Sequence, residues 1–294
     1  RRAVVWSGSG WGSKTDLGTH RTDTLGNSRA SAVSRDSSVV VGEAGGDTFS
    51  QHATVWSGSG WSSKTDLGTL SSGNANGSSA SAVSGDGSVV AGWAHNDNYE
   101  QRAIVWSGSG WQTKTDLGTL SSGNAGNSVA NAVSRDGSVV VGSAHDDNST
   151  SRATVWSGSG WQTKTDLGTH RTDTLGNSVA QAASSDGSVV GGFADNDNGD
   201  THATVWSGSN WSTKTDLGTL KTDNSGFSQL YGFSADGNIA VGGSDNDNGD
   251  FRAVVWNLRG GRAVDTANTR ASLSLLSADT ASLLAQRARA AENL

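Results

Sequence analysis

The side chains best suited to chemistry in this sequence are the carboxylates of short acidic loops. Two loops read Asp-Asn-Asp-Asn-Gly-Asp, at residues 195–200 and 245–250, and looser copies stand at 95–98 and 145–148. Oxygen ligands at alternate positions suit Ca²⁺, which makes calcium the one cofactor to test. The distal Glu of an EF-hand loop is absent, so polar hairpin loops are the competing interpretation. The candidate ligands are Asp195, Asp197, Asp200, Asp245, Asp247 and Asp250.

The remaining polar residues that could act chemically are repeated rather than unique. His52 and His202 occupy a repeat position that is Arg in the other copies, which indicates a need for a long polar side chain. Cysteine is absent, which excludes disulfides, zinc–thiolate sites and thiol catalysis. A catalytic site requires a few unlike residues that converge on one place. The sequence therefore predicts a protein that is not an enzyme and has no catalytic residues.

Tryptophans divide the chain into equal parts. A fixed period of about 20–50 residues indicates a solenoid, a propeller or another array. The first tryptophan recurs every 50 residues, without insertion or deletion, at Trp6, Trp56, Trp106, Trp156, Trp206 and Trp256. The second recurs at Trp11, Trp61, Trp111, Trp161 and Trp211. The two tryptophans of a copy could meet across a hairpin and pack between repeats, or they could form a ring of aromatic platforms for sugars.

Each period predicts four short strands. In the third copy, segments 102–106 and 111–117 flank a Gly-rich link, which is a hairpin signal. Segments 128–134 and 138–144 are Val- and Ala-rich, and the last is a continuous apolar run. Four short antiparallel strands per period of this length are typical of a propeller blade. We therefore predict an all-β propeller of four-stranded blades.

Two further motifs recur within the strands. Asp136-Gly137 lies between two apolar segments, which predicts a type I′ hairpin turn with two positive φ angles. Ser37 replaces the glycine in the first copy, where we expect strain. An Asp precedes Leu-Gly-Thr in each copy, and we expect it to accept hydrogen bonds from backbone amides. These aspartates are Asp16, Asp66, Asp116, Asp166 and Asp216.

Blade number depends on how the two ends of the chain are used. The Val/Ala-rich pair has five copies, whereas the Trp hairpin has five full copies and a degenerate sixth at 252–266. Five complete blades and one spare hairpin fit this count. Six blades would require a strand pair from upstream of Arg1 or from another chain. The two terminal hairpins compete for one position, unless one of them closes the ring.

The chain divides into residues 1–266, the propeller, and residues 267–294, a tail. Residues 269–292 are rich in Ala and Leu and lack Gly, and their leucines recur at helical spacing, so we predict a helical tail. The net charge of −7 argues against a nucleic-acid partner. There is no apolar run of about 18 residues, the length that a membrane-spanning helix needs.

Three segments resemble the extracellular HAF repeat family. They are His52-Ala-Thr-Val-Trp56, with its copy at 202–206, the recurring Thr-Asp-Leu-Gly-Thr, and Gly87-Ser-Val-Val-Ala-Gly92 with its copies. The third position of the first segment, usually aromatic in the family, is Thr54 here. The resemblance covers about residues 1–256 and implies a passenger region of a Gram-negative autotransporter or another surface protein. The tail at 269–292 resembles the segment that joins such a passenger to its barrel, which would be the only membrane link. The family implies no catalytic residues.

These observations predict a secreted or surface-displayed propeller passenger that acts as a multivalent binding or adhesion module. The expected partner is an extracellular glycan or a host protein surface, and oligomeric state is open. The competing hypotheses are a structural spacer or self-assembling surface protein, and a propeller hydrolase. The repeated loops vary most and should decide what is bound. The predicted binding residues are His20, Phe49, Asn74, Tyr99, Asn124, His170, Asp223 and Phe251.

Overall fold

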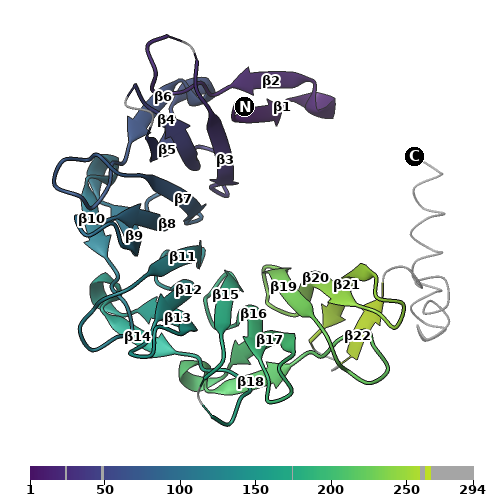
Figure 1. Cartoon of the computed structure of the whole chain (residues 1–294). Coiled ribbons are helices and arrows are strands. Elements are labelled where there is room, and N and C mark those ends of the chain that lie inside the picture. Colours follow the sequence, from purple (N-terminus) through teal and green to yellow (C-terminus); the bar gives the residue numbers. More distant parts are fainter. Residues whose placement is uncertain (24, 48–49, 174, 259–261, 266–294) are drawn as a thin grey trace, which may run out of the picture.

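The computed structural model describes residues 1–23, 25–47, 50–173, 175–258 and 262–265. Within these residues the strands form five four-stranded antiparallel sheets and one two-stranded hairpin. The sheets stand side by side around a common centre as the blades of an open ring (Figure 1). The predicted all-β propeller is therefore confirmed. None of the helices in the described part has the length and apolar character needed to cross a bilayer.

Each blade has one strand order, from the inner strand at the centre to the outer strand at the rim. Blades 1 and 2 contain β3 (Ser28–Val33), β4 (Val40–Gly45), β5 (Gln51–Ser57), β6 (Ser63–Asp66), β7 (Ser78–Val83), β8 (Val90–His95), β9 (Gln101–Ser107) and β10 (Thr113–Asp116). Blades 3 and 4 contain β11 (Ser128–Val133), β12 (Val140–His145), β13 (Ser151–Ser157), β14 (Thr163–Asp166), β15 (Ser178–Ala183), β16 (Val190–Asp195), β17 (Thr201–Ser207) and β18 (Thr213–Asp216). Blade 5 contains β19 (Ser228–Phe233), β20 (Ile239–Asp245), β21 (Phe251–Asn257) and β22 (Arg262–Asp265).

The sequence period and the blade are out of step by half a unit. The two inner strands of a blade come from the end of one period, and the two outer strands come from the start of the next. The C-terminal hairpin therefore completes blade 5. The N-terminal hairpin, β1 (Val4–Ser7) with β2 (Ser13–Asp16), stands alone beside blade 1, at one side of the opening in the ring (Figure 1). The five-blade count is correct, and the spare hairpin is the N-terminal one.

Glycine lets the two inner strands of a blade approach closely. A Cβ on Gly142 of β12 would lie 1.9 Å from the carbonyl oxygen of Val129 on β11. The register of this pair shifts between Ala130 and Ala132, which marks a bulge. The equivalent glycines are equally crowded, at Gly42, Gly92, Gly192 and Gly242. This crowding explains why the fourth segment of each period keeps a glycine inside an apolar run.

The hairpin turn at the Asp-Gly dipeptide is present, but it is not the predicted type I′ turn. Gly87 has a φ of 76°, whereas Asp86 keeps a negative φ. The turn is closed by the Gly87 N–H, which donates to the Ser84 carbonyl, and left-handed Gly87 follows it. Asp86 holds the turn because its Oδ1 accepts from the Ser84 hydroxyl and the Ser88 amide. The strain expected at Ser37 is confirmed by its φ of 61°.

The first tryptophan of each later copy is a core residue at a boundary between blades. Trp56, Trp106, Trp156 and Trp206 are fully buried, and Trp256 is nearly so. Trp106 lies opposite Lys114 in the ladder, so the predicted cross-strand pair of tryptophans is wrong. The second tryptophan lies in the turn instead, where Trp111 has a φ of 58° and its Nε1 donates to the Gly87 carbonyl at 2.9 Å.

Backbone hydrogen bonds link the inner turns of successive blades. The amide of Arg35 donates to the carbonyl of Gly85 at 3.1 Å, and the amide of Gly85 donates to Arg135 at 2.8 Å. The chain of bonds continues from Arg135 to Ser185 at 2.9 Å and from Ser185 to Ala235 at 3.1 Å. Each bond spans one whole period, so the inner rim of the ring repeats with the sequence. The tail predicted at 267–294 lies outside the described residues.

Candidate binding site

Both predicted loop sets lie on the same face of the ring. One set connects the outer strand of a blade to the inner strand of the next, at 17–27, 67–77, 117–127, 167–177 and 217–227. The other set connects the two middle strands of each blade, at 46–50, 96–100, 146–150, 196–200 and 246–250. Antiparallel strands alternate in direction, which brings all these loops to one end of the blades. We call their described residues the loop face.

Aspartates tie the two loop sets together. In blade 2, Asp97 Oδ1 accepts from the backbone amide of Ser72 at 2.7 Å and from its hydroxyl at 3.0 Å. Asp147 accepts the amide of Ser122 at 2.7 Å, and the same contact recurs at Asp47, Asp197 and Asp247. The loops of each pair are therefore fastened to one another, and the loop face repeats with every blade.

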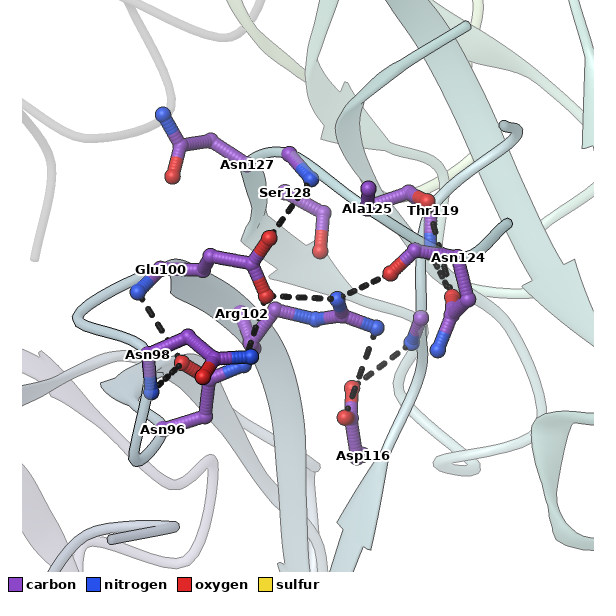
Figure 2. A network of polar contacts seen from close by, with 12 residues as sticks. Asn96, Asn98, Glu100, Arg102, Asp116, Thr119, Asn124, Ala125, Asn127 and Ser128 are labelled. Carbon is purple, nitrogen blue, oxygen red and sulfur yellow. Dashed lines mark hydrogen bonds and ion pairs between the residues drawn. The ribbon is translucent and has the colours of Figure 1, made fainter. Parts of the chain in front are cut away.

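A buried arginine connects one loop pair to the next, because Glu100 and Asn124 belong to successive pairs. Arg102 is 2% exposed, and its guanidinium lies between Glu100, Asp116 and the carbonyl of Asn124 (Figure 2). The Asn124 carbonyl is 2.6 Å from Nη1, and the carboxylates of Glu100 and Asp116 are 3.5 Å and 3.4 Å from the guanidinium nitrogens. Glu100 in turn accepts from the Gly126 amide at 2.9 Å. This position therefore requires a long polar side chain, as the sequence predicted.

Histidine fills the same position in two blades. His202 Nδ1 lies 2.8 Å from Asp216 Oδ2, and this hydrogen bond raises the pKa of His202. Burial raises the pKa of Asp216, but hydrogen bonds from His202 and from the Gly218 amide outweigh it and lower that pKa overall. Asp66 and His52 form the same pair, 2.9 Å apart. The five aspartates of the Asp-Leu-Gly-Thr motif accept hydrogen bonds from backbone amides, as expected. The donors are the amides of Gly18, Gly68, Gly118, Gly168 and Gly218.

Five of the predicted binding residues make structural contacts, three within their own loops and the two histidines with a strand beneath them. Asn74 and Asn124 have positive φ angles of 50° and 52°, and their side chains accept the amides of Thr69 and Thr119. His20 and His170 lie 3.0 Å from the hydroxyls of Thr54 and Thr204, and burial lowers the pKa of both histidines. Asp223 accepts the amide of Ser225 at 2.9 Å. These contacts position the loop backbone, whose exposed atoms are then available to a partner.

The apolar side chains exposed on the loop face come partly from positions that the sequence did not single out. Tyr99 is 74% exposed and has a φ of 61°. Phe251 is half exposed and stacks obliquely on Phe227 with ring centres 5.9 Å apart. Leu25 and Leu175 are 65% and 57% exposed, and both occur in the two near-identical His-Arg-Thr-Asp-Thr-Leu loops. That shared sequence was the available signal. Phe49 lies outside the described residues.

The six candidate calcium ligands all have hydrogen-bond or ionic partners. Asp195 accepts the amide of Asn177 and the hydroxyl of Thr201, and Asp200 accepts the amide of Gly226. The other four also have partners. Asp197 contacts Thr172 and Asp247 contacts Thr222, while Asp245 contacts Phe227 and Asp250 contacts Arg252. No three metal-binding side chains gather within the described residues. Calcium binding stays a prediction that requires these contacts to rearrange, and a melting temperature unaffected by chelator would exclude it.

The loop face is acidic. The pKa of Asp147 is lowered by the amide and hydroxyl of Ser122, and that of Asp247 is lowered by Thr222. Hydrogen bonds from Arg21 and Arg171 lower the pKa values of Asp23 and Asp173 to about 2. These carboxylates are ionised at neutral pH. Arg21 and Arg171 balance the charges of Asp23 and Asp173, so the acidic character of the loop face comes from its other carboxylates, which disfavour polyanions.

A second candidate region lies on the opposite face, at the centre of the ring. A cavity of about 930 Å³ is lined by the inner turns and contains Arg35, Arg135, Asp36, Asp86, Asp136 and Asp186. The aspartates hold their turns, as Asp86 does. The residue before each of them varies as Arg35, Gly85, Arg135, Ser185 and Ala235. This central cavity was not predicted from the sequence, although the variation at the residue before the constant Asp could have indicated it.

Comparison with solved structures supports the propeller fold. The chain is similar to TolB from Agrobacterium tumefaciens, at 14% identity and a TM-score of 0.51, over 86% of this chain and 83% of that one. It is also similar to TolB from Acinetobacter baumannii, at 10% identity and a TM-score of 0.50, over 86% of this chain and 56% of that one. A Mycobacterium tuberculosis puromycin-hydrolysing peptidase matches at 13% identity and a TM-score of 0.56, over 86% of this chain and 39% of that one.

At these identities the likeness concerns the fold alone. The chain spans little more than half of the Acinetobacter TolB chain and about two fifths of the peptidase chain. No protein-family model and no curated protein matches the sequence.

Proposed function

We propose that the protein is a non-enzymatic, multivalent binding module that holds a repeated extracellular ligand on its loop face. The observation that carries this proposal is the repeated tie between the two loop sets, from Asp47, Asp97, Asp147, Asp197 and Asp247. Each tie fixes one loop pair, so the ring presents similar surfaces at a regular spacing. Polar side chains beneath the loops make structural contacts, such as His202 with Asp216 and Arg102 with Asn124, which is why we propose binding rather than catalysis.

The chemistry of the loop face favours a neutral, hydroxyl-rich ligand such as an uncharged glycan. Exposed amides and hydroxyls of the loops can bind sugar hydroxyls, and Tyr99, Leu25 and Leu175 offer apolar contacts beside them. Ionised aspartates disfavour sulfated or sialylated chains. The resemblance to HAF repeats supports a secreted or surface-displayed location in a bacterial envelope, and the TolB-like fold is consistent with it.

Weak sites on one rigid ring gain strength from avidity. One site of about millimolar affinity is worth only about 4 kcal/mol. Several such sites that meet a repeated ligand together gain about 10²–10⁴ in apparent affinity. We therefore expect weak binding to a monosaccharide or short oligosaccharide and strong retention on an immobilised neutral polysaccharide.

The test compares retention of the protein on dense neutral and sulfated polysaccharide surfaces. Tyr99→Ser, Leu25→Ser and Leu175→Ser should each reduce retention on the neutral surface in part, and the triple variant should reduce it further. Gln112→Ala, an exposed change in a turn on the opposite face, is the matched control and should have no effect. Loss of all binding by one loop variant would indicate a unique site instead. Equal retention by every variant would refute the proposal that the loop face binds the ligand.

Self-assembly without a small ligand is the second candidate, favoured by the N-terminal hairpin, which has no inner strand pair among the described residues. Light scattering over a range of protein concentrations separates it from the first, because a monomer at all concentrations argues against assembly.

A further inference from the structure

Within the described residues, the N-terminal hairpin corresponds to the outer half of a blade and has no inner strand pair beside it. β1 is four residues long, whereas its equivalents β5, β9, β13, β17 and β21 are each seven residues long. Those longer strands pair with an inner neighbour as well as with the outer strand, as β13 does with both β12 and β14. Among the described strands, β1 pairs with β2 alone. Its shorter ladder follows from the absence of the inner partner.

One edge of β1 therefore presents unpaired backbone groups. The Ala3 carbonyl accepts the Leu17 amide on the β2 side, at 3.0 Å. Backbone polar groups alternate along a strand, so Val4 and Trp6 direct theirs to the opposite, open side. In blade 3 the same side of the equivalent strand is filled, with Val140 opposite Trp156 and Gly142 opposite Thr154.

An apolar cavity lies along this open edge. Its volume is about 640 Å³, and it runs between β1 and the inner strand β3 of blade 1. Its walls include Val4, Val5, Ala32 and Val33. Val33 is 55% exposed, whereas the equivalent Val83 and Val133 are half-buried against neighbouring blades. Both walls are thus surfaces that an inner strand pair covers at the other blade boundaries.

Both tryptophans of the hairpin are exposed for the same reason. Trp6 is 54% exposed and Trp11 is 73% exposed, although the equivalents of Trp6 are buried. In blade 2 the indole of Trp111 donates to the Gly87 carbonyl in the inner turn of its own blade. Among the described residues no inner turn lies beside the N-terminal hairpin, and none of them is a hydrogen-bond acceptor for the Trp11 indole.

We propose that the open edge of β1 is an acceptor site for a β-hairpin with the inner-pair pattern of this repeat. The donor is a polypeptide segment other than residues 1–294 of this chain or of a second copy. The donor pattern is that of residues 128–145, with Ser-x-Asp-Gly at its turn and Gly-x-Ala in its second strand. The register follows from blade 3. The residue equivalent to Val140 lies opposite Trp6, and the glycine equivalent to Gly142 lies opposite Val4. Binding covers Trp6 and Trp11 and completes a sixth blade.

The C-terminal residues fit the register of an inner strand pair poorly. Ser277-Ala-Asp279 repeats the Ser-x-Asp of the inner turn. Thr280 would then occupy the left-handed position of Gly137, whose φ is 76°, and a β-branched residue is strained there. Ala285 would occupy the position of Gly142, where a Cβ lies 1.9 Å from a backbone oxygen. The inner pairs of blades 1 to 5 are already paired within their own sheets.

The test adds a synthetic peptide of residues 128–145 to the full chain and follows hydrogen exchange of residues 1–11 by mass spectrometry. We expect exchange at Val4 and Trp6 to slow by about tenfold or more at saturating peptide, because an open edge becomes a paired one. The control peptide carries Gly142→Val, which places a side chain against the Val129 carbonyl and should not protect. Equal protection by both peptides, or none by either, overturns the proposal.

A substitution in β1 tests whether protection by the peptide requires the open edge of this strand. Val4→Pro removes an amide from the open edge and should abolish protection by the peptide, while exchange in β5 stays unchanged if the fold is intact. Protection of residues 1–11 that grows with protein concentration, without peptide, would show that a second copy fills the site and would overturn the proposed donor. Protection already present in dilute protein would assign the site to this chain itself and would also overturn it.

Discussion

The indole Nε1 of Trp106 donates to the carbonyl of Leu67 at 3.1 Å, across the boundary between blades 1 and 2. The same bond joins Trp56 to Leu17 and Trp206 to Leu167, each at 2.9 Å. Lysines add a parallel link at the rim, where Lys114 Nζ donates to the Thr69 carbonyl at 2.8 Å. Adjacent blades are therefore joined by directional bonds as well as by apolar packing.

Trp106→Phe should destabilise the protein by about 1–3 kcal/mol, because the buried carbonyl of Leu67 loses its donor while most of the packing is kept. Trp6→Phe is the matched control. Trp6 occupies the same repeat position but is 54% exposed, and its replacement should change stability by less than about 0.5 kcal/mol. Urea unfolding followed by circular dichroism measures both. Equal effects would show that the bond across the boundary contributes little.

Gly137→Val should cost about 1 kcal/mol or more. Gly137 has a φ of 76°, and an added Cβ would lie 2.7 Å from Cγ2 of Val89 in the neighbouring blade. Gly123→Val is the control, because Gly123 has no positive φ and a Cβ there would meet nothing within 4 Å. The comparison is made by thermal melting. An unchanged melting curve for Gly137→Val would contradict the turn geometry.

His202 and His170 should titrate on opposite sides of the ordinary histidine value. The hydrogen bond to Asp216 raises the pKa of His202, and burial lowers the pKa of His170. The stability from His202 is therefore present below its unfolded pKa, about 6.5, and is lost as pH rises through the folded pKa. The stability from neutral His170 is present above about 6.5 and is lost as pH falls. NMR titration of the imidazole signals checks both directions, and Asp216→Asn should remove the rise at His202.

Acid should loosen the inner turns only at low pH, after carboxylates with ordinary pKa values have been protonated. Hydrogen bonds from the Ser84 hydroxyl and the Ser88 amide lower the pKa of Asp86 to about 2, and the Ser184 and Ser188 groups do the same for Asp186. These folded values lie below the unfolded value, so the contribution is present above about pH 4 and is lost between about pH 4 and 2. Asp86→Asn should lower the melting temperature at pH 6 but hardly at pH 2. A difference that is the same at both pH values would contradict this role.

The fold could be predicted because the sequence period itself carries the signal. Identical spacing of Trp106 and Trp156, with two hairpin signals between them, fixes the number of strands per unit and hence the class of fold. The half-unit offset could not be predicted, because sheet membership depends on which neighbours pair in space. The type I′ turn was wrong because the pattern of Asp136-Gly137 does not show that the Asp side chain binds the preceding Ser134 and keeps its own φ negative.

The two variable loop sets were predicted from the sequence, whereas the structural role of each residue in them was predicted only in part; binding by these loops stays a prediction. Both variable loop sets lie on one face, as alternation of antiparallel strands requires. Asn124 was singled out for its variable loop, yet its positive φ and its bond to the Thr119 amide give it a role in shaping the backbone. Leu175 was overlooked because exposure cannot be read from a leucine in a polar loop. Tyr99 was both predicted and exposed.

The half-unit offset between period and blade also bears on how such a chain can change in length. Each blade is sealed by strands from two successive periods, so a cut at any period boundary divides a sheet rather than separating two finished ones. Removing or duplicating 50 residues at the same point of the period, by contrast, rejoins an inner pair to an equivalent outer pair. The resulting contacts across blade boundaries would be of the kinds already present, because the tryptophan, leucine and glycine partners recur at each step. Recombination between repeats of the gene can thus alter the circumference of the ring in whole blades without any new interface having to arise.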